Sequence, residues 1–359
     1  MIWNILLAFV PVSLLLGYVF HAGAIWVFIT AIISIVPLAN WVRRGTEQMA
    51  RISGPAIGGL LNVTFGNMPE LILAFFVLAA GQSAVVKGQI TGSIIGNSLL
   101  GLGVAILAGS WGRENQTFKR ERAGLLSSLL VLGTIGLLLP ALFHYTEHGL
   151  VSATDARHLE DRLSLGVSIV LIIVYAGNLA YTLVTHRDVF ALDEGDSSKK
   201  QDKWSRNKAL GVLAGATVLV ALEAELVSGA LVATAGALGV SAFFLGVIVL
   251  AVIGNAAEYV SAIYFARQNQ LGLVFTITVG SSIQVALFVA PLLVIISHFT
   301  KHPMNLVFSN PLELIAIAGA AFAVNSIAQD GETTWFEGLL LVAVYIILGL
   351  AFFYVTPGR

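Results

Sequence analysis

The chain has 359 residues, of which 57% are hydrophobic and 11% are charged, and its mean hydropathy is +0.89. A soluble domain carries about 25% charged residues, so this composition excludes an ordinary soluble domain. The net charge of −1 gives no general attraction to nucleic acid, and no nucleic acid partner is expected. The absence of cysteine excludes disulfides, thiol catalysis and cysteine metal sites.

Apolar runs long enough to cross about 30 Å of hydrocarbon recur along the chain, which indicates an all-α, multi-pass protein of the lipid bilayer. The first run lacks a basic segment before it and a small-residue cleavage site, so it is predicted to be a membrane helix and not a signal peptide. The eleven predicted spans are, in chain order, 2–20, 23–42, 54–80, 86–111, 123–144, 163–185, 209–236, 241–266, 271–298, 308–328 and 335–356.

Two connections between the predicted spans are long and polar, at 145–162 and 186–208. The second contains a run of charged residues and is predicted to be a solvated cytoplasmic linker between two halves. The expected domains are an extra N-terminal helix (1–22), a first half (23–185), the linker (186–208) and a second half (209–359).

The basic residues predict the orientation. With spans that alternate in direction, fourteen of the nineteen Lys and Arg fall on one face and five on the other. The excess of positive charge on cytoplasmic loops places the first face, and the N-terminus, in the cytoplasm and the C-terminus outside it. Short loops and the lack of a targeting extension favour the plasma membrane of a prokaryote.

Two stretches inside apolar runs share the pattern Gly-Asn-x-x-Glu, one ending at Glu70 and the other at Glu258. A shift of 188 positions superimposes them and aligns further pairs: Ala74 with Ala262, Gln82 with Gln270, Gly92 with Gly280, Ser93 with Ser281 and Ile95 with Ile283. Because the two copies lie five predicted spans apart, they cross the membrane in opposite directions. This predicts an inverted repeat, with copies at 58–103 and 246–291, as in secondary transporters whose substrate site lies near the bilayer midplane.

Several carboxylates are predicted to lie inside the spans, where no Lys or Arg is expected to face them. These are Glu70, Glu223, Glu225, Glu258, Glu313 and Glu337. Carboxylates without basic partners in a membrane mark ion or proton pathways. Burial favours their neutral form, whereas a bound cation requires the ionised form. The pattern therefore predicts a site at which cations and protons compete.

All candidate ligands are oxygens, which suit Ca²⁺ first and Mn²⁺ next. They are Glu70, Glu258, Asn67, Asn255, Ser93, Asn97, Ser281, Ser282 and Gln284. Two alternatives stay open: the Asn side chains cap broken helices or join neighbouring helices, and the Ser side chains allow close helix packing. The His residues lie near span ends or in loops, so no zinc or copper site and no resident cofactor is expected.

A second group of carboxylates is a candidate gate or proton relay. Glu223 and Glu225 lie in the seventh predicted span, and Glu225 is a candidate partner of Glu47, which is expected at the start of the third span. Glu313 and Glu337 are expected at the membrane interface or packed in neutral form.

The chain resembles the calcium/proton (CAX-type) antiporters of the calcium/cation antiporter superfamily. The matching motifs lie at 58–70, 183–187, 246–258, 280–284, 330–331 and 335–338. The resemblance implies two inverted halves of five helices after an extra helix, and proton uptake in exchange for Ca²⁺ that leaves the cytosol. It also implies that Glu70 and Glu258 are the essential ligands, helped by Ser93, Asn97, Ser281 and Gln284.

Two departures from that family leave alternatives open. Tyr259 stands where the family often has His after the second Glu, and Met68-Pro69-Glu70 is closer to the Pro-Glu of sodium/calcium exchangers. Na⁺/Ca²⁺ exchange and a broader divalent cation exchange that includes Mn²⁺ are therefore alternatives, and a cation channel is a remote one. No His-Glu-x-x-His motif occurs, so an intramembrane metalloenzyme, and enzymatic activity in general, is not predicted. The sequence leaves the oligomeric state open, with a homo-oligomer as one alternative.

Overall fold

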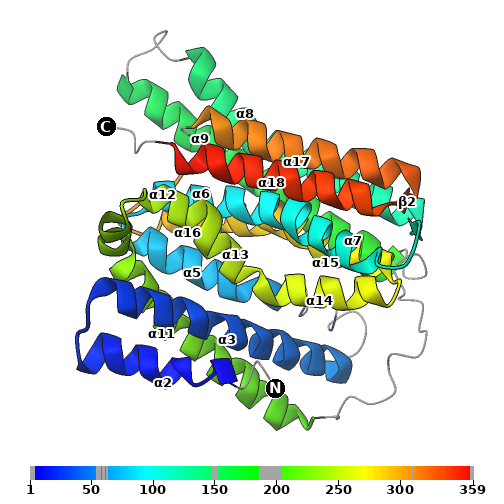
Figure 1. Cartoon of the computed structure of the whole chain (residues 1–359). Helices are drawn as coiled ribbons and strands as arrows, with labels where there is room; N and C mark the ends of the chain where they lie inside the picture. The colour runs from blue at the N-terminus through cyan, green and yellow to red at the C-terminus, as the bar shows by residue number, and fades with distance from the viewer. Residues whose placement is uncertain are drawn as a thin grey trace.

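The computed structural model describes residues 5–53, 58, 61, 64–147, 153–185, 204–308 and 310–355. Most of the helices lie side by side along one common direction (Figure 1). The described part holds one short antiparallel ladder, in which β1 (Gln116–Thr117) pairs with β2 (Glu332–Thr333). This ladder ties the loop before α8 to the loop before α18.

The regular elements of the described residues are α-helices and short π-helical segments, written η. In chain order they are α2 (Phe9–Leu14), η1 (Leu15–Val19), α3 (Ala24–Ser53), α5 (Met68–Ala79), α6 (Ser83–Ile95), η2 (Gly96–Gly101), α7 (Leu102–Gly109), α8 (Arg120–Glu147), α9 (Ala153–Ala180), η3 (Tyr181–Thr185), α11 (Arg206–Leu238), α12 (Ala242–Phe244), η4 (Leu245–Leu250), α13 (Ala251–Gly254), α14 (Ala256–Arg267), α15 (Leu271–Gln284), η5 (Val285–Val289), α16 (Ala290–Ser297), α17 (Pro311–Asp330) and α18 (Trp335–Phe353).

The lengths of these helices confirm the predicted membrane fold. Among the described residues, 8 helices are long and apolar enough to cross a membrane, and α12 to α14 form a further span that is bent by 51°. Two shorter apolar helices, Phe9–Val19 and Met68–Ala79, lie within the predicted spans 2–20 and 54–80. Each predicted span therefore overlaps an apolar helix.

The predicted boundaries differ from the structure where helices continue beyond the apolar run. The polar connection expected at 145–162 is largely helical, because α8 extends to Glu147 and α9 begins at Ala153. In the same way α3 continues to Ser53, past the predicted end at 42. Hydropathy marks where the hydrocarbon ends, whereas backbone hydrogen bonds continue into water. Residues 186–203, most of the predicted linker, lie outside the described residues, as do 59–60 and 62–63 of the first motif.

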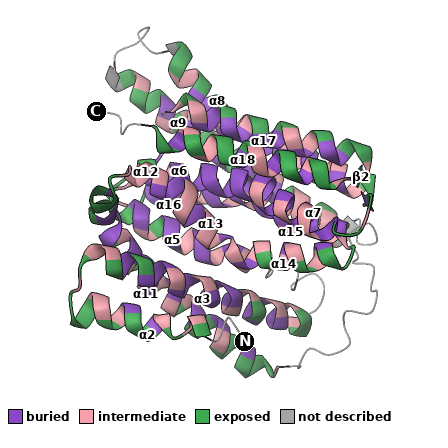
Figure 2. Cartoon of the chain, viewed as in Figure 1, coloured by how far each residue is buried: buried purple, intermediate pink, exposed green. Residues whose placement is uncertain are grey.

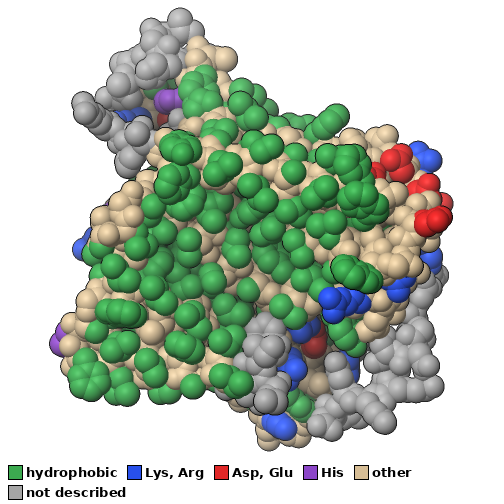
Figure 3. Space-filling model, viewed as in Figure 1, with side chains coloured by type: hydrophobic (Ala, Val, Ile, Leu, Met, Phe, Trp, Pro, Cys, Tyr) green, Lys and Arg blue, Asp and Glu red, His purple; other side chains and the backbone are tan. Residues whose placement is uncertain are grey.

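The outer surface suits a hydrocarbon environment. Apolar side chains cover most of the face seen in Figure 3, and charged side chains gather at its edges. Outer helices expose large apolar residues along their length, for example Ile173 of α9 and Ile347 of α18, each 63% exposed. Burial is concentrated instead in the central helices (Figure 2). This distribution is that of a multi-pass membrane protein.

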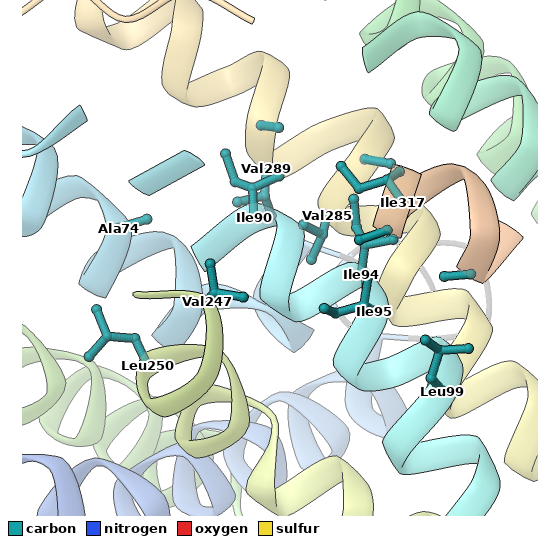
Figure 4. Packing of buried hydrophobic residues seen from close by; sticks show 14 of the residues in the cluster. Ala74, Ile90, Ile94, Ile95, Leu99, Val247, Leu250, Val285, Val289 and Ile317 are labelled. Carbon is teal, nitrogen blue, oxygen red and sulfur yellow. The ribbon is translucent and has the colours of Figure 1, made fainter. Parts of the chain in front are cut away.

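The centre of the molecule is α6 with η2. Ile94, Ile95 and Leu99 are fully buried there, and Ile90, Val285 and Val289 pack around them (Figure 4). α6 crosses η4 so closely that a Cβ at Gly92 would lie 1.9 Å from the carbonyl oxygen of Val247. Only glycine permits this backbone contact. The crossing brings the first repeat directly against the second.

Candidate cation site

Both Gly-Asn-x-x-Glu motifs interrupt a helix at their asparagine. The backbone leaves the helical region at Asn67 (φ −100°, ψ 20°) and at Asn255 (φ −93°, ψ 2°), and α5 and α14 begin directly after them. Pro69 lies in the first turn of α5, where its missing N–H costs no hydrogen bond. The second break has Ala257 at the corresponding position, so proline is not what creates the break.

Each glutamate lies in the first turn of a half-helix that starts inside the molecule. Glu70 occupies this place in α5, and Glu258 occupies it in α14. The positive end of a helix dipole favours negative charge at such positions. The fold therefore offsets part of the cost of a buried carboxylate at both sites.

Asn255 joins the two repeats. Its side-chain amide donates to the carbonyl oxygen of Ala251 (2.8 Å), which also accepts from the backbone N–H of Asn255 (3.2 Å), so Asn255 caps the end of α13. The same amide nitrogen donates to the Glu70 carboxylate and to Ser93 Oγ (3.2 Å). Asn255 therefore caps a broken helix and also contacts Glu70, and its role as a cation ligand stays a prediction.

Glu70 is held by polar side chains and is closely covered. Ser93 Oγ donates to Glu70 Oε1 (3.0 Å), and the side chain is 4% exposed. Gly254 lies against it, since a Cβ at that position would be 3.3 Å from Glu70 Oε1. The glycine of one motif thus makes room for the glutamate of the other.

The remaining predicted ligands extend this network across the repeats. Asn97 Nδ2 donates to Asn255 Oδ1 (2.7 Å) and to Ser281 Oγ (3.0 Å). Ser281 Oγ in turn donates to Asn67 Oδ1 (3.3 Å) and also bonds Glu258. One step away, the hydroxyls of Ser98 and Ser282 lie 2.9 Å apart.

Gln284 lies at the first helix break. A Cβ at Gly66 would be 3.6 Å from Gln284 Oε1. The position that the repeat aligns with Gln284 is Gly96, and the position aligned with Asn97 is Val285. The site is therefore only partly symmetric: its two glutamates and two serines correspond, and its flanking amides do not.

Buried oxygens around both glutamates have no hydrogen-bond donor among the described residues. They are Glu70 Oε2, Glu258 Oε2, Asn97 Oδ1 and Gln89 Oε1. Buried polar atoms normally have partners, and oxygens without donors are the ligands that a hard cation requires. The described residues hold no group of three or more His, Asp and Glu suited to a metal ion. The two carboxylates are thus the charged groups of the candidate site, and neutral amide and hydroxyl oxygens surround them.

Gln89 was not among the predicted site residues. Its side chain is 3% exposed and donates from Nε2 to the backbone oxygen of Glu70 (3.3 Å). With Glu70 and Ser93 it lines a small cavity of about 10 Å³, close to the size that holds one water molecule. Gln89 precedes Ser93 by four positions, so both lie on one helical face, and that spacing was the available signal.

Tyr259 follows Glu258 and packs against η2. A Cβ at Gly96 would lie 2.6 Å from the Tyr259 hydroxyl oxygen, and one at Gly101 would lie 2.7 Å from its ring. The hydroxyl has no partner among the described residues. The tyrosine at this position therefore occupies a slot that two glycines provide.

The structure does not bring the predicted gate residues together. Glu47 lies within α3, not at the start of the third span, and pairs with Arg43 one turn away. Nearby Gly45 packs against Leu213 of α11. Glu225 is twelve residues beyond Leu213, or about 18 Å at 1.5 Å per residue. Its carboxylate accepts from the Tyr18 hydroxyl instead (2.9 Å).

Among the described residues, no Lys or Arg forms an ion pair with Glu70, Glu223, Glu258 or Glu313. Lys87 stands one helical turn before Thr91 in α6, whose hydroxyl donates to Glu313, so a lysine lies on the same helical face as this contact. Its Nζ donates to Asn305 and Val307, and Arg43 pairs with Glu47. The Glu70 carboxylate is bonded by the neutral side chains of Ser93 and Asn255.

Glu313 and Glu337, the remaining internal carboxylates of the prediction, differ in what they bond. Glu313 is 2% exposed and accepts from the Thr91 hydroxyl (3.1 Å). Glu337 lies at the start of α18, where it accepts from the backbone N–H of Thr334 (2.8 Å) and completes a capping box. Its role at this helix terminus agrees with the expected interfacial position.

A comparison with protein families finds one that covers most of the chain. The model of the family described as sodium/calcium exchanger protein matches residues 23–184 and 208–354. A Ca(2+)/H(+) antiporter of Aphanothece halophytica is 43% identical over 97% of this chain and 95% of its own length. The Ca(2+)/H(+) antiporter ChaA of Bacillus subtilis is 38% identical over 96% of both chains.

Solved structures show the same fold. Native YfkE superimposes with a TM-score of 0.83 at 34% identity, over 98% of this chain and 100% of the other. A structure described as the H+/Ca2+ exchanger CAX gives a TM-score of 0.72 over 99% of this chain and 88% of the other, at 14% identity. At that identity the likeness concerns the fold alone.

Proposed function

The chain belongs to the sodium/calcium exchanger protein family, and we propose that it is a secondary transporter that exports cytosolic Ca²⁺ in exchange for H⁺. The names of its relatives support this exchange, because two that match nearly the whole chain are Ca(2+)/H(+) antiporters. The proposal assigns Glu70 and Glu258 as the residues that bind Ca²⁺ and protons in turn.

The observation that carries the proposal is the set of unpartnered oxygens around the two glutamates. Glu70 and Glu258 each have one buried carboxylate oxygen without a donor among the described residues. When ionised, the pair supplies two negative charges, which match one divalent cation. When protonated, each oxygen becomes a donor and no cation is needed. Ca²⁺ and protons thus satisfy the same atoms and exclude each other.

Alternating access follows from the position of the site between the repeats. Asn255 and Ser281 of the second repeat bond Glu70 and Asn67 of the first. If one repeat rocks against the other, this shared site opens toward one side of the membrane at a time. We assign the cytoplasm to the side that carries Arg43, Arg113 and Arg206, since basic residues favour that side.

Transport into proteoliposomes tests the proposal. Vesicles with an acidic lumen and a trapped Ca²⁺ indicator receive external Ca²⁺. Outward movement of protons is expected to drive Ca²⁺ accumulation, and a protonophore is expected to abolish it. Glu70→Gln and Glu258→Gln are expected to lose the flux, because each retains volume but not charge. Proton-driven flux that persists in either variant contradicts the assignment.

The matched control is Glu313→Gln, which changes a carboxyl that is as buried as that of Glu70 but bonded to Thr91 outside the site. This variant is expected to retain the flux. Repeating the assay at clamped pH with an Na⁺ gradient separates H⁺ coupling from the Na⁺ coupling that the Pro69-Glu70 motif leaves as an alternative. Mn²⁺ as a competitor then measures the breadth of selectivity.

A further inference from the structure

A second buried carboxyl group lies away from the cation site, between α2, α3 and α11. Glu223 is fully buried in α11, and its Oε1 lies 2.6 Å from Ser13 Oγ of α2. Ser34 of α3 completes the cluster, with its hydroxyl 3.3 Å from that of Ser13. All three side chains are 0% exposed. These helices form one side of the molecule, next to α5 (Figure 1).

No positive charge compensates Glu223. The sequence has no Lys or Arg in α2, η1 or α5, none in α3 before Arg43 and none in α11 after Lys208. The titratable groups on the nearby parts of these elements are Tyr18 of η1 and Glu225 of α11, which bond each other, and Glu70 of α5, which belongs to the candidate cation site. The remaining ones lie toward the end of the helix pair where Gly45 packs against Leu213, ten residues before Glu223; they are Arg43, Arg44, Glu47 and Arg51 of α3 and Arg206 and Lys208 of α11. Glu223 Oε2 has no donor among the described residues.

The hydrogen bonds of the cluster can be counted. Ser34 donates to the carbonyl oxygen of Thr30 (2.8 Å), and Ser13 has the carbonyl oxygen of Val10 within reach (2.8 Å). If Glu223 carries a proton, it donates to Ser13, Ser13 donates to Val10, and every hydroxyl hydrogen has an acceptor. If Glu223 is ionised, Ser13 has only one hydrogen to offer and the second carboxylate oxygen stays bare. A buried charge with a single hydrogen bond and no counter-ion is strongly unfavourable.

We propose that Glu223 is a proton-binding residue separate from the cation site, protonated while α2 packs on α3 and α11. Loss of the proton requires water at the carboxylate, and water reaches it only when α2 and η1 separate from α11. Deprotonation and this separation are thus coupled events. α11 also packs against α5, which carries Glu70, so movement of α11 has a direct route to the cation site. The inference does not rest on the proposed function, because the coupling exists without transport.

The contact between Gly17 and Leu226 offers a direct probe of the separation. A Cβ at Gly17 would lie 3.3 Å from Leu226 Cγ, across the boundary between η1 and α11. The natural chain has no cysteine, so Gly17→Cys with Leu226→Cys introduces one reactive pair across this contact. The initial rate of oxidative cross-linking in detergent or vesicles reports how often η1 and α11 are in contact.

The cross-linking rate of this cysteine pair is measured across a range of pH in three proteins. They are the otherwise natural chain, the chain that also carries Glu223→Gln and the chain that also carries Glu225→Gln. Dividing the rate in the otherwise natural chain by the rate in the Glu223→Gln variant removes the intrinsic pH dependence of thiols. This ratio is expected to fall as pH rises, by up to about tenfold per pH unit, the limit for one linked proton. Glu225→Gln, two residues away and exposed, is expected to follow the natural chain. A ratio that stays constant with pH, or an equal effect of Glu225→Gln, overturns the proposal.

An infrared measurement keeps the test independent of how well Glu223→Gln folds. The natural protein is expected to show a protonated carboxyl C=O band that disappears when the pH is raised. Ser13→Ala removes the hydrogen-bond partner and is expected to shift this band, whereas Glu225→Gln is expected to leave it in place. A band that Ser13→Ala does not move contradicts the assignment.

Discussion

The side-chain amide of Asn255, in the second repeat, donates to the carboxylate of Glu70, in the first. The relationship is repeated by Ser281, which donates to Asn67 across the same boundary. Neither repeat therefore completes its own half of the site. A site assembled in this way changes whenever one repeat moves relative to the other, as an alternating-access transporter requires.

Asn255→Ala is expected to weaken Ca²⁺ binding. The change removes a donor to Glu70 and an acceptor for Asn97, whereas the backbone N–H at position 255 still bonds Ala251. Unsatisfied buried groups cost about 1–3 kcal/mol, which corresponds to about a 5- to 150-fold rise in the Ca²⁺ concentration for half-maximal transport. Asn325→Ala is the control, because that amide bonds Ser127 in another part of the membrane region. Equal losses in both variants would show a general effect on folding.

The sequence predicted those residues of the candidate site that repeat. Glu70, Glu258, Ser93 and Ser281 were predicted because the two copies align, whereas helices broken at asparagine were only one of the alternatives left open. Gln89 and Tyr259 have no aligned counterpart, so the repeat gave no signal for them.

The errors concern contacts between distant segments. Lys87 falls at the end of the predicted span 86–111, and hydropathy does not show that the loop at 305–307 covers it. Glu47 was expected to meet Glu225, yet their separation depends on how α3 and α11 are aligned. The order of apolar runs predicts which helices exist, whereas their relative alignment depends on close contacts such as that between Gly45 and Leu213.

Gly92→Ala is expected to prevent the native crossing of α6 and η4. The added Cβ would lie 1.9 Å from the Val247 carbonyl oxygen, which is backbone and cannot rotate away. Overpacking of this kind costs about 1–3 kcal/mol or more, measured as a lower midpoint of thermal unfolding in detergent. The repeat supplies the control: Gly280, aligned with Gly92, has open space around its Cβ position. Gly280→Ala is expected to unfold at the natural midpoint, and an equal fall in both variants contradicts the argument.

Gly96→Ala is expected to impair transport, because the added methyl group displaces Tyr259. The added methyl group would lie 2.6 Å from the hydroxyl oxygen but 3.9 Å from the ring carbon that bears it, so the clash involves the hydroxyl alone. Tyr259→Phe removes that atom. The double variant Gly96→Ala/Tyr259→Phe is therefore expected to recover flux that Gly96→Ala loses, whereas Gly124→Ala, in open space on α8, should have no effect. Absence of recovery would mean that Gly96 acts on something other than Tyr259.

Lys87→Met is expected to destabilise the protein by leaving Glu313 without its nearby positive charge. Lys87 Nζ donates to Asn305 Oδ1 (2.8 Å) and to the Val307 carbonyl oxygen (2.7 Å), and it thus also holds this loop in place. Leaving buried polar groups without their hydrogen-bond partners costs about 1–3 kcal/mol each, seen as a lower unfolding midpoint. Lys301→Met, which removes an exposed lysine, should leave the midpoint unchanged.

Adding Glu313→Gln to Lys87→Met neutralises the stranded charge, so the double variant should regain part of the lost stability. The fall in the unfolding midpoint that remains in the double variant then measures the hydrogen bonds from Lys87 to the loop. If Glu313→Gln deepens the loss instead, the Lys87–Glu313 interaction is not what stabilises this region.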